Sequence, residues 1–349
     1  MVIFLLLEKN GQKKSLLVNP DIDMNNILFC SCGRRAQLFK FLKDSLGDSC
    51  QIIATDISNI APALYEADKR YLVPRIDDPT YIDRILKICK ENDVKAITTL
   101  IDPEIEVLAA NRDLFLKEGI LPLCPSKETA AYCFDKFAMF EHLTRNHINT
   151  VLTYDTMEHF MTGYQKGKIS FPVFIKPRTG SGSVGIHKVN DLEELKKYMD
   201  EGAFDYIIQE FMQGGDCDAD VYIDCFSHEP VAIFSKRKLE TKIGGASKTI
   251  SFKDDRLFRF VKDVCKVLEL NGPVDMDLWY KDGQYYLSEI NPRFGGAYLH
   301  AYGAGVDFFK LIKNNMEGKK NEEIIGQYDE GVLMMMYDSV VIVKEKDLV

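Results

Sequence analysis

The sequence lacks any long apolar run, so a transmembrane helix is not expected. No stretch of its 349 residues approaches the about 18 consecutive apolar residues that such a helix needs. The opening MVIFLLLEKN holds a short apolar run with no positive charge before it, unlike a secretory signal. An excess of positive charge is also lacking, because the net charge is −9. Neither a membrane surface nor a nucleic acid is therefore expected as a partner.

The nine cysteines include no C-x-x-C pair and have no regular spacing. An odd, irregular set in a chain of this length indicates reduced thiols and a cytoplasmic location, not a disulfide framework. Cys30 and Cys32 would share one face of a strand, where packing in the core is favoured over metal binding. The six histidines have no metal-ligand spacing, and no G-x-S-x-G motif suggests a serine nucleophile.

Residues 24–125 alternate strand-like and helix-like segments. NILFCSCGRR passes from an apolar run into a small-residue turn, QIIATDI and KAITTLI are further apolar strands, and helical patterns separate them. This order predicts an α/β domain with a doubly wound parallel sheet. A Pro122-x-x-Pro125 turn marks its end. Residues 1–23 are either an additional hairpin or an over-called start.

From residue 126 the pattern changes to an α+β arrangement. The expected elements are four strands and one long amphipathic helix, at 171–176, 206–211, 219–226, 231–239 and 256–270. VLMMMYD and VVIVKE add two strands near the end of the chain. We expect a two-lobed domain over 126–320, with lobes of about 126–206 and 207–320, and a C-terminal β element over 321–349.

Acidic and amide side chains face each other in an expected hairpin, GPVDMDLWYKDGQYYLSEINP. Asp275 and Asp277 share one face of its first strand, and Glu289 and Asn291 share one face of the second. A tight turn brings Asp277 roughly opposite Glu289, and buried like charges that close need a proton or a cation between them. Oxygen donors of this kind suit Mg²⁺. The alternative, a polar strand end facing solvent, stays open from the hairpin alone.

A second group of residues suits phosphate binding. Lys176 closes the strand FPVFIK, and the loop Gly180-Ser181-Gly182-Ser183-Val184-Gly185 follows shortly after it. Glycines let backbone N–H groups approach an anion closely. This loop is not a P-loop, because its lysine precedes the glycines. By itself it also fits an ordinary surface turn.

A third group suits an adenosine. Glu210 ends a strand, Phe211 and Met212 offer apolar walls and backbone groups, and Asp216 follows a glycine pair. An adenine needs an acceptor for its amino group, a backbone donor and apolar walls, and a ribose suits a carboxylate. The same residues also fit an acidic strand–turn–strand.

These three groups, in this order, resemble the ATP-grasp superfamily, and most closely its branch that is similar to the carbamoyl-phosphate synthase large chain and biotin carboxylase. The resemblance covers nearly the whole chain from Met24. It implies an N-terminal pre-ATP-grasp domain over 24–125 and two ATP-gripping lobes beyond it. Only one ATP-grasp unit is present, and no biotin-carrier segment is recognisable, so neither named reaction is assigned.

The resemblance also implies roles for individual residues. Asp277, Glu289 and Asn291 correspond to the metal ligands, and Arg293 to an arginine near the transferring phosphoryl group. Arg237 is a candidate for binding the substrate or its phosphate, and GGAS (244–247) resembles a loop near the phosphates. The family usually has glutamate where this chain has Asp216. The implied nucleotide-binding residues are Lys136, Lys176, Arg178, Gly180, Ser181, Gly182, Ser183, Gly185, Glu210, Phe211, Met212 and Asp216, with Lys176 also counted as catalytic.

The implied activity is that of an ATP-dependent ligase. ATP would phosphorylate a small-molecule carboxylate, and an amine or similar nucleophile would attack the acyl phosphate. Two Mg²⁺ ions are expected, with Mn²⁺ as an alternative, and a homodimer is one assembly to consider. Two other functions stay open: a regulatory protein that binds nucleotide without turnover, and a dinucleotide-dependent oxidoreductase. The oxidoreductase is disfavoured because Gly33 stands alone in the first strand–helix turn, where G-x-G-x-x-G is needed.

Overall fold

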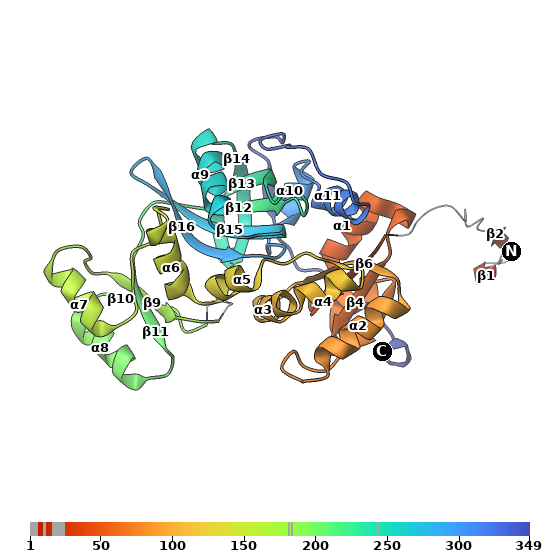
Figure 1. Cartoon of the computed structure of the whole chain (residues 1–349), viewed down its shortest axis with the longest axis horizontal. Coiled ribbons are helices and arrows are strands. Elements are labelled where there is room, and N and C mark those ends of the chain that lie inside the picture. Colours follow the sequence, from red (N-terminus) through yellow and green to blue (C-terminus); the bar gives the residue numbers. More distant parts are fainter. Residues whose placement is uncertain (1–5, 10–11, 16–24, 181, 183, 243–244) are drawn as a thin grey trace.

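The computed structural model describes residues 6–9, 12–15, 25–180, 182, 184–242 and 245–349. These residues form four β-sheets, which Figure 1 shows as a small N-terminal pair of strands and three larger units. The small pair consists of β1 (Leu6–Lys9) and β2 (Gln12–Ser15), which run antiparallel. In the part of the chain that the structure describes, no helix is both long and apolar enough to cross a membrane.

The first large unit is a five-stranded parallel sheet in the order β5-β4-β3-β6-β7. Its strands are β3 (Asn26–Cys30), β4 (Ile52–Asp56), β5 (Lys69–Leu72), β6 (Val94–Thr99) and β7 (Leu121–Pro122). Its helices are α1 (Ala36–Leu46), α2 (Tyr81–Glu91), α3 (Asp102–Ala110) and α4 (Arg112–Lys117). The adjacent β3 residues Leu28 and Phe29 belong to different apolar clusters, so both faces of the sheet are covered. The predicted doubly wound domain is confirmed.

The strand order of this sheet reverses between β3 and β6. The chain builds outward from β3 through β4 to β5, then returns to place β6 on the other side of β3. In open α/β sheets, ligands bind outside the carboxyl ends of the strands at such a switch point. Here those ends are followed by residues 31–35 and 100–102.

The second unit is a four-stranded antiparallel sheet in the order β10-β9-β11-β8. Its strands are β8 (Thr153–Tyr154), β9 (Val173–Pro177), β10 (His187–Val189) and β11 (Tyr206–Glu210). The helices of this region are α5 (Lys127–Phe134), α6 (Lys136–Arg145), α7 (Met157–Gln165) and α8 (Leu192–Glu201). The expected cap Ser126 accepts a hydrogen bond from the backbone N–H of Thr129, so α5 starts where the sequence indicates.

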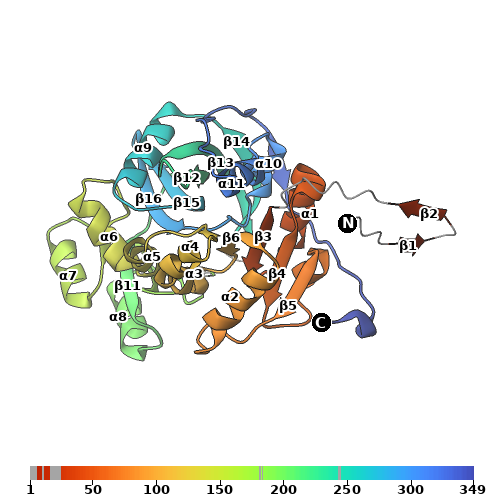
Figure 2. The same ribbon diagram turned by 45° about the vertical axis from the view of Figure 1, so that its right-hand side comes forward.

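The third unit is a six-stranded antiparallel sheet in the order β16-β15-β12-β13-β14-β17. Its strands are β12 (Gly215–Ile223), β13 (Pro230–Lys242), β14 (Gly245–Phe252), β15 (Gly272–Lys281), β16 (Gln284–Asn291) and β17 (Leu333–Met335). Its helices are α9 (Asp255–Lys266), α10 (Leu299–Gly303) and α11 (Phe308–Met316). Figure 2 shows this sheet above the junction between the other two units.

Two expected strands differ from the structure. β12 begins at Gly215 rather than at residue 219, because the alternating polar residues 216, 218 and 220 continue the strand on its acidic face. The expected C-terminal pair of strands is reduced to β17, which extends the sheet edge beside β14. VVIVKE (340–345) forms no strand; its last residue begins a short 3₁₀ turn at Glu345–Asp347, and most of its side chains are exposed.

Candidate active site

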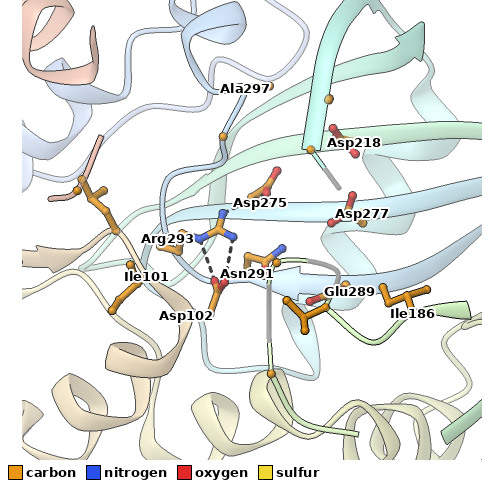
Figure 3. Close-up of a pocket in the computed structure, with 18 of the residues that line it drawn as sticks. Ile101, Asp102, Ile186, Asp218, Asp275, Asp277, Glu289, Asn291, Arg293 and Ala297 are labelled. Atoms are coloured by element: carbon orange, nitrogen blue, oxygen red, sulfur yellow. Dashed lines mark hydrogen bonds and ion pairs between the residues drawn. The ribbon is translucent and has the colours of Figure 1, made fainter. Parts of the chain in front are cut away.

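One cavity of about 560 Å³ lies where the three large units meet. The parallel sheet contributes the turns after β3 and β6, the second unit contributes Lys176 and the glycine loop, and the third contributes the acidic hairpin. Figure 3 shows Asp277, Glu289 and Asn291 on neighbouring strands of this hairpin. The cavity therefore brings together three groups of residues that are far apart in the sequence.

A two-residue turn fixes the start of the hairpin. Asp282 and Gly283 have φ angles of 49° and 83°, as a type I′ turn requires. The flanking residues Lys281 and Gln284 are paired, so the expected turn is correct.

A β-bulge then brings the two carboxylates opposite each other. Pairing is regular up to Leu278 and Leu287, and its continuation would place Ser288 opposite Asp277. The register instead shifts by one residue, so that Glu289 faces Asp277. Bulges beside functional sites commonly re-aim side chains in this way. The expectation that Asp277 lies roughly opposite Glu289 is confirmed, and the bulge is its structural cause.

The carboxylates of the hairpin are held in different electrostatic surroundings. Burial raises the pKa of Asp277, but the Lys238 charge, hydrogen bonds with Asp218 and Lys238, and the Lys236 charge together lower it to about 2. Burial raises the pKa of Glu289, and the charges of Lys176 and Lys136 oppose that rise. Asn291 is buried opposite Asp275 and supplies a neutral oxygen donor beside them.

Two lysines reach the same cavity from the second unit. Lys176 lies on β9 and is 7% exposed, so burial lowers the pKa of its ammonium group while Glu289 raises it. Lys136 begins α6, and its Nζ donates a hydrogen bond of 2.7 Å to the carbonyl of Gly180. Both cations therefore stand between the acidic hairpin and the glycine loop.

The glycine loop meets this cavity with part of its length. Gly180 and Gly182 line the cavity, and both have positive φ angles, 111° and 74°, that favour glycine. Gly185 does not line it, and a Cβ there would lie 2.9 Å from the ring of Phe204. Ser181, Ser183 and Gly244, also expected near the phosphates, lie outside the described residues.

Arg293 joins the hairpin to the parallel sheet. Its Nε lies 2.9 Å from Asp102 Oδ1 at the start of α3, and its Nη1 lies 3.2 Å from Asp275 Oδ2. Figure 3 shows the pair with Asp102. Arg35 donates from its Nη2 to the carbonyl of Gly295 at 2.9 Å, and burial followed by the Arg293 charge lowers its pKa to about 10. The turn after the hairpin is thus held from both sides.

The residues expected around an adenosine lie beyond the cavity lining. Glu210 pairs through Oε1 with Lys281 Nζ at 2.7 Å, and the Phe211 ring lies 5.0 Å from that of Phe174. Met212 is 4% exposed. Asp216 pairs with Lys238, which does line the cavity, so this segment adjoins the phosphate side without forming part of its wall.

Two expected arginines point elsewhere. Arg178 pairs with Asp135 at 2.7 Å beside α6 and does not line the cavity. Arg237 is exposed and lies over the Phe252 ring at 5.1 Å. Its strand neighbour Lys238 lies on the opposite face of β13 and reaches the acidic hairpin instead.

Sequence reasoning missed five charged residues of the cavity: Asp102, Asp218, Lys238, Arg34 and Arg35. The alternation Asp216-Cys217-Asp218 was a usable signal for the second of these, because it places two carboxylates on one face of a strand. The other four come together only through contacts between distant parts of the chain.

His300 supports the segment that follows Arg293. It is 2% exposed; Nε2 lies 2.9 Å from the Val332 carbonyl oxygen and Nδ1 lies 2.7 Å from Thr249 Oγ1. Burial lowers its pKa from 6.5 to about 4, with a smaller effect of the Lys236 charge. A neutral histidine therefore links α10, β14 and the segment before β17.

Acid should weaken the fold through His300. Its folded pKa lies below its unfolded value, so the unfolded state binds the extra proton as the pH falls from 6.5 towards 4. Relative to His300→Gln, which does not titrate, the wild type should lose about 3 kcal/mol of unfolding free energy over that range. Urea unfolding at several pH values measures this difference. The exposed His147→Gln variant is the control, and an equal pH dependence in wild type and His300→Gln would refute the assignment.

Two family models match the chain. A PylC-like N-terminal domain matches residues 27–123, and an ATP-grasp domain matches residues 133–297. The carbamoyl phosphate synthase large chain of Clostridium acetobutylicum is 22% identical over 288 residues, covering 78% of this chain and 26% of that protein. The D-alanine–D-alanine ligase of Francisella philomiragia is 25% identical over 261 residues, covering 69% of this chain and 85% of that protein.

A solved structure supports the same fold. The biotin carboxylase domain dimer of the 2-oxoglutarate carboxylase from Hydrogenobacter thermophilus, in complex with MgADP, ADP and bicarbonate, superposes with a TM-score of 0.70. It is 18% identical and covers 88% of this chain and 73% of that chain. The match to the synthase large chain spans about a quarter of that protein's length.

Proposed function

Because the chain belongs to the ATP-grasp superfamily, we propose that it is a ligase that uses ATP to join a carboxylate to an amine. The observation that supports this most is the pairing of Asp277 with Glu289 beside two lysines, Lys176 and Lys136, in one cavity. Such a set binds phosphates and a cation without offering a nucleophilic side chain. Positioning and electrostatic stabilisation are then the whole of the protein's contribution.

The donor set of the hairpin fits Mg²⁺. Asp277, Glu289 and Asn291 provide two carboxylates and one amide oxygen, and Mg²⁺ usually takes few protein ligands besides water and phosphate. Within the described ranges, no group of three or more His, Cys, Asp or Glu side chains has the arrangement of a metal site made by protein alone. We propose that these three side chains would hold two magnesium ions, with Mn²⁺ as an alternative. When bound, they would neutralise charge on the β- and γ-phosphates.

The remaining nucleotide contacts follow from the cavity wall. Lys176 and Lys136 would hold the phosphates, and Gly180 and Gly182 would let backbone groups approach them. We propose that the adenosine of ATP binds at residues 210–216, which adjoin the cavity through the ion pair of Asp216 with Lys238. Arg293 would steady the phosphoryl group in transfer.

The acid substrate would enter from the parallel sheet. Residues 31–35 and 100–102 follow the two strands at the switch point and line the cavity. An oxygen of the bound carboxylate would attack the γ-phosphorus, and ADP would leave. The amine would then attack the acyl carbon, lose a proton and expel phosphate, which forms the C–N bond.

A substrate screen tests this function. Mg²⁺-ATP with a panel of carboxylates and amines should yield ADP and phosphate only with a matched pair. With an ¹⁸O-labelled carboxylate, one labelled oxygen should appear in the released phosphate, because the acyl phosphate passes it on. Hydroxylamine in place of the amine should give a hydroxamate. Tight ATP binding without products across the panel would instead support a nucleotide-binding regulatory protein.

Two broader assignments also stay proposals. All nine cysteines are free and eight are buried, which suits a reducing compartment such as the cytoplasm. The related biotin carboxylase domain was solved as a dimer, which makes a homodimer the first assembly to test in solution.

A further inference from the structure

A row of charged residues crosses four strands of the six-stranded sheet. Lys236 on β13 pairs with Asp218 on β12, Asp218 pairs with Asp277 on β15, and Asp277 pairs with Glu289 on β16. Three carboxylates are therefore direct cross-strand neighbours, an arrangement that destabilises a sheet unless positive charge compensates it.

Lys236 provides part of that compensation. Its Nζ lies 2.5 Å from Asp220 Oδ2 and 4.0 Å from Asp218 Oδ2, so its shorter ion pair is with the next carboxylate along β12. The Lys236 side chain is fully buried.

Lys238 provides the closer ion pairs. Its Nζ lies 2.6 Å from Asp277 Oδ1, 2.8 Å from Asp218 Oδ1 and 2.9 Å from Asp216 Oδ1. Asp277 and Asp218 are directly opposite each other, and this one ammonium group lies within ion-pair distance of both carboxyl groups. Three acidic side chains therefore contact the same ammonium group.

Two cations would compete for the Asp277 carboxylate. In the proposed function, Asp277 is a magnesium ligand, and Mg²⁺ binds carboxylate oxygens at about 2.0–2.1 Å. An ammonium group 2.6 Å from Asp277 Oδ1 would repel an ion that binds the same carboxylate. Lys238 lines the cavity and has a flexible four-carbon stem, so it has somewhere to move.

We propose that Lys238 is a built-in counter-cation that holds Asp216, Asp218 and Asp277 together until a magnesium nucleotide displaces it from Asp277. Lys238 thereby sets the magnesium concentration that nucleotide binding requires. This inference rests on the proposed function, because it takes Asp277 as a magnesium ligand. Release of Lys238 also frees Asp216, the expected ribose ligand.

Calorimetric titration with ADP at a series of Mg²⁺ concentrations tests the proposal. In Lys238→Met, the Mg²⁺ concentration for half-maximal ADP binding should fall at least about tenfold, because the carboxylates then attract the ion without competition. In Lys238→Gln, whose amide still donates to these carboxylates, this Mg²⁺ concentration should also fall. A folding defect of one variant therefore does not decide the result. Lys238→Arg keeps the charge and should stay within about twofold of wild type.

The controls separate this role from others. Lys248→Met removes a lysine paired with the exposed Glu240 and should leave the Mg²⁺ requirement unchanged. An unchanged requirement in Lys238→Met and Lys238→Gln would overturn the proposal. A higher Mg²⁺ requirement in these variants, together with weaker ADP binding in the absence of Mg²⁺, would also overturn it, because Lys238 would then be a phosphate ligand. Absence of Mg²⁺-dependent ADP binding in wild type would overturn the proposed function and this inference together.

Discussion

Glu289→Gln should lower the rate of ADP formation by about 10³-fold or more, while the protein stays folded. Glu289 faces Asp277 across the bulge, and the Lys176 charge acts on it, so in the proposed function it is the carboxylate that would link the cation to the phosphates. An amide of the same shape keeps the packing but carries no charge. A coupled assay for ADP with the matched substrate pair measures the loss.

Stability distinguishes this role from a structural one. Burial raises the pKa of Glu289, which means that the folded protein holds its charge at a cost. Removing that charge should therefore leave the melting temperature equal or slightly higher. Glu240→Gln, on the exposed end of β13, is the control and should retain activity within about twofold. Full turnover by Glu289→Gln would refute the metal assignment.

The acidic hairpin was predictable because local rules determine it. The Asp282-Gly283 turn fixes the register near the strand ends, and alternation along each strand assigns Glu289 and Asn291 to one face. Those rules alone would have paired Asp277 with Ser288, and only the bulge corrects this by one residue. The sequence motif was specific enough to identify the facing pair, although its cause became visible only in the structure.

The remainder of the cavity depends on contacts that no local rule supplies. Arg237 was expected at the phosphates, yet in the structure it is exposed and Lys238 occupies the inner face. The register of β13 against its neighbouring strands decides which of Arg237 and Lys238 faces the cavity. A register shift of one residue would exchange their faces. Asp102 lies 191 residues from Arg293 in the sequence, so this partner follows only from how the units pack.

Arg293→Met should destabilise the fold by about 3–5 kcal/mol, because it removes the ion-pair partner of two partly buried carboxylates. Asp102 and Asp275 have side chains 21% and 14% exposed, and both depend on this guanidinium. Urea unfolding measures the change in unfolding free energy. Arg75→Met, which removes an exposed ion pair with Asp77, should change it by less than about 1 kcal/mol.

A double variant separates the charge effect from lost packing. If unpaired carboxylates cause the instability, Asp275→Asn should recover part of the loss in Arg293→Met, since one of the two negative charges is then absent. Equal stability of the single and double variants would mean that packing dominates. Asp102 begins α3 and Asp275 lies on β15. By pairing with both, Arg293 joins the parallel sheet to the acidic hairpin. Loss of Arg293 should therefore also loosen the junction where the acid substrate is proposed to enter, which predicts a higher KM for that substrate.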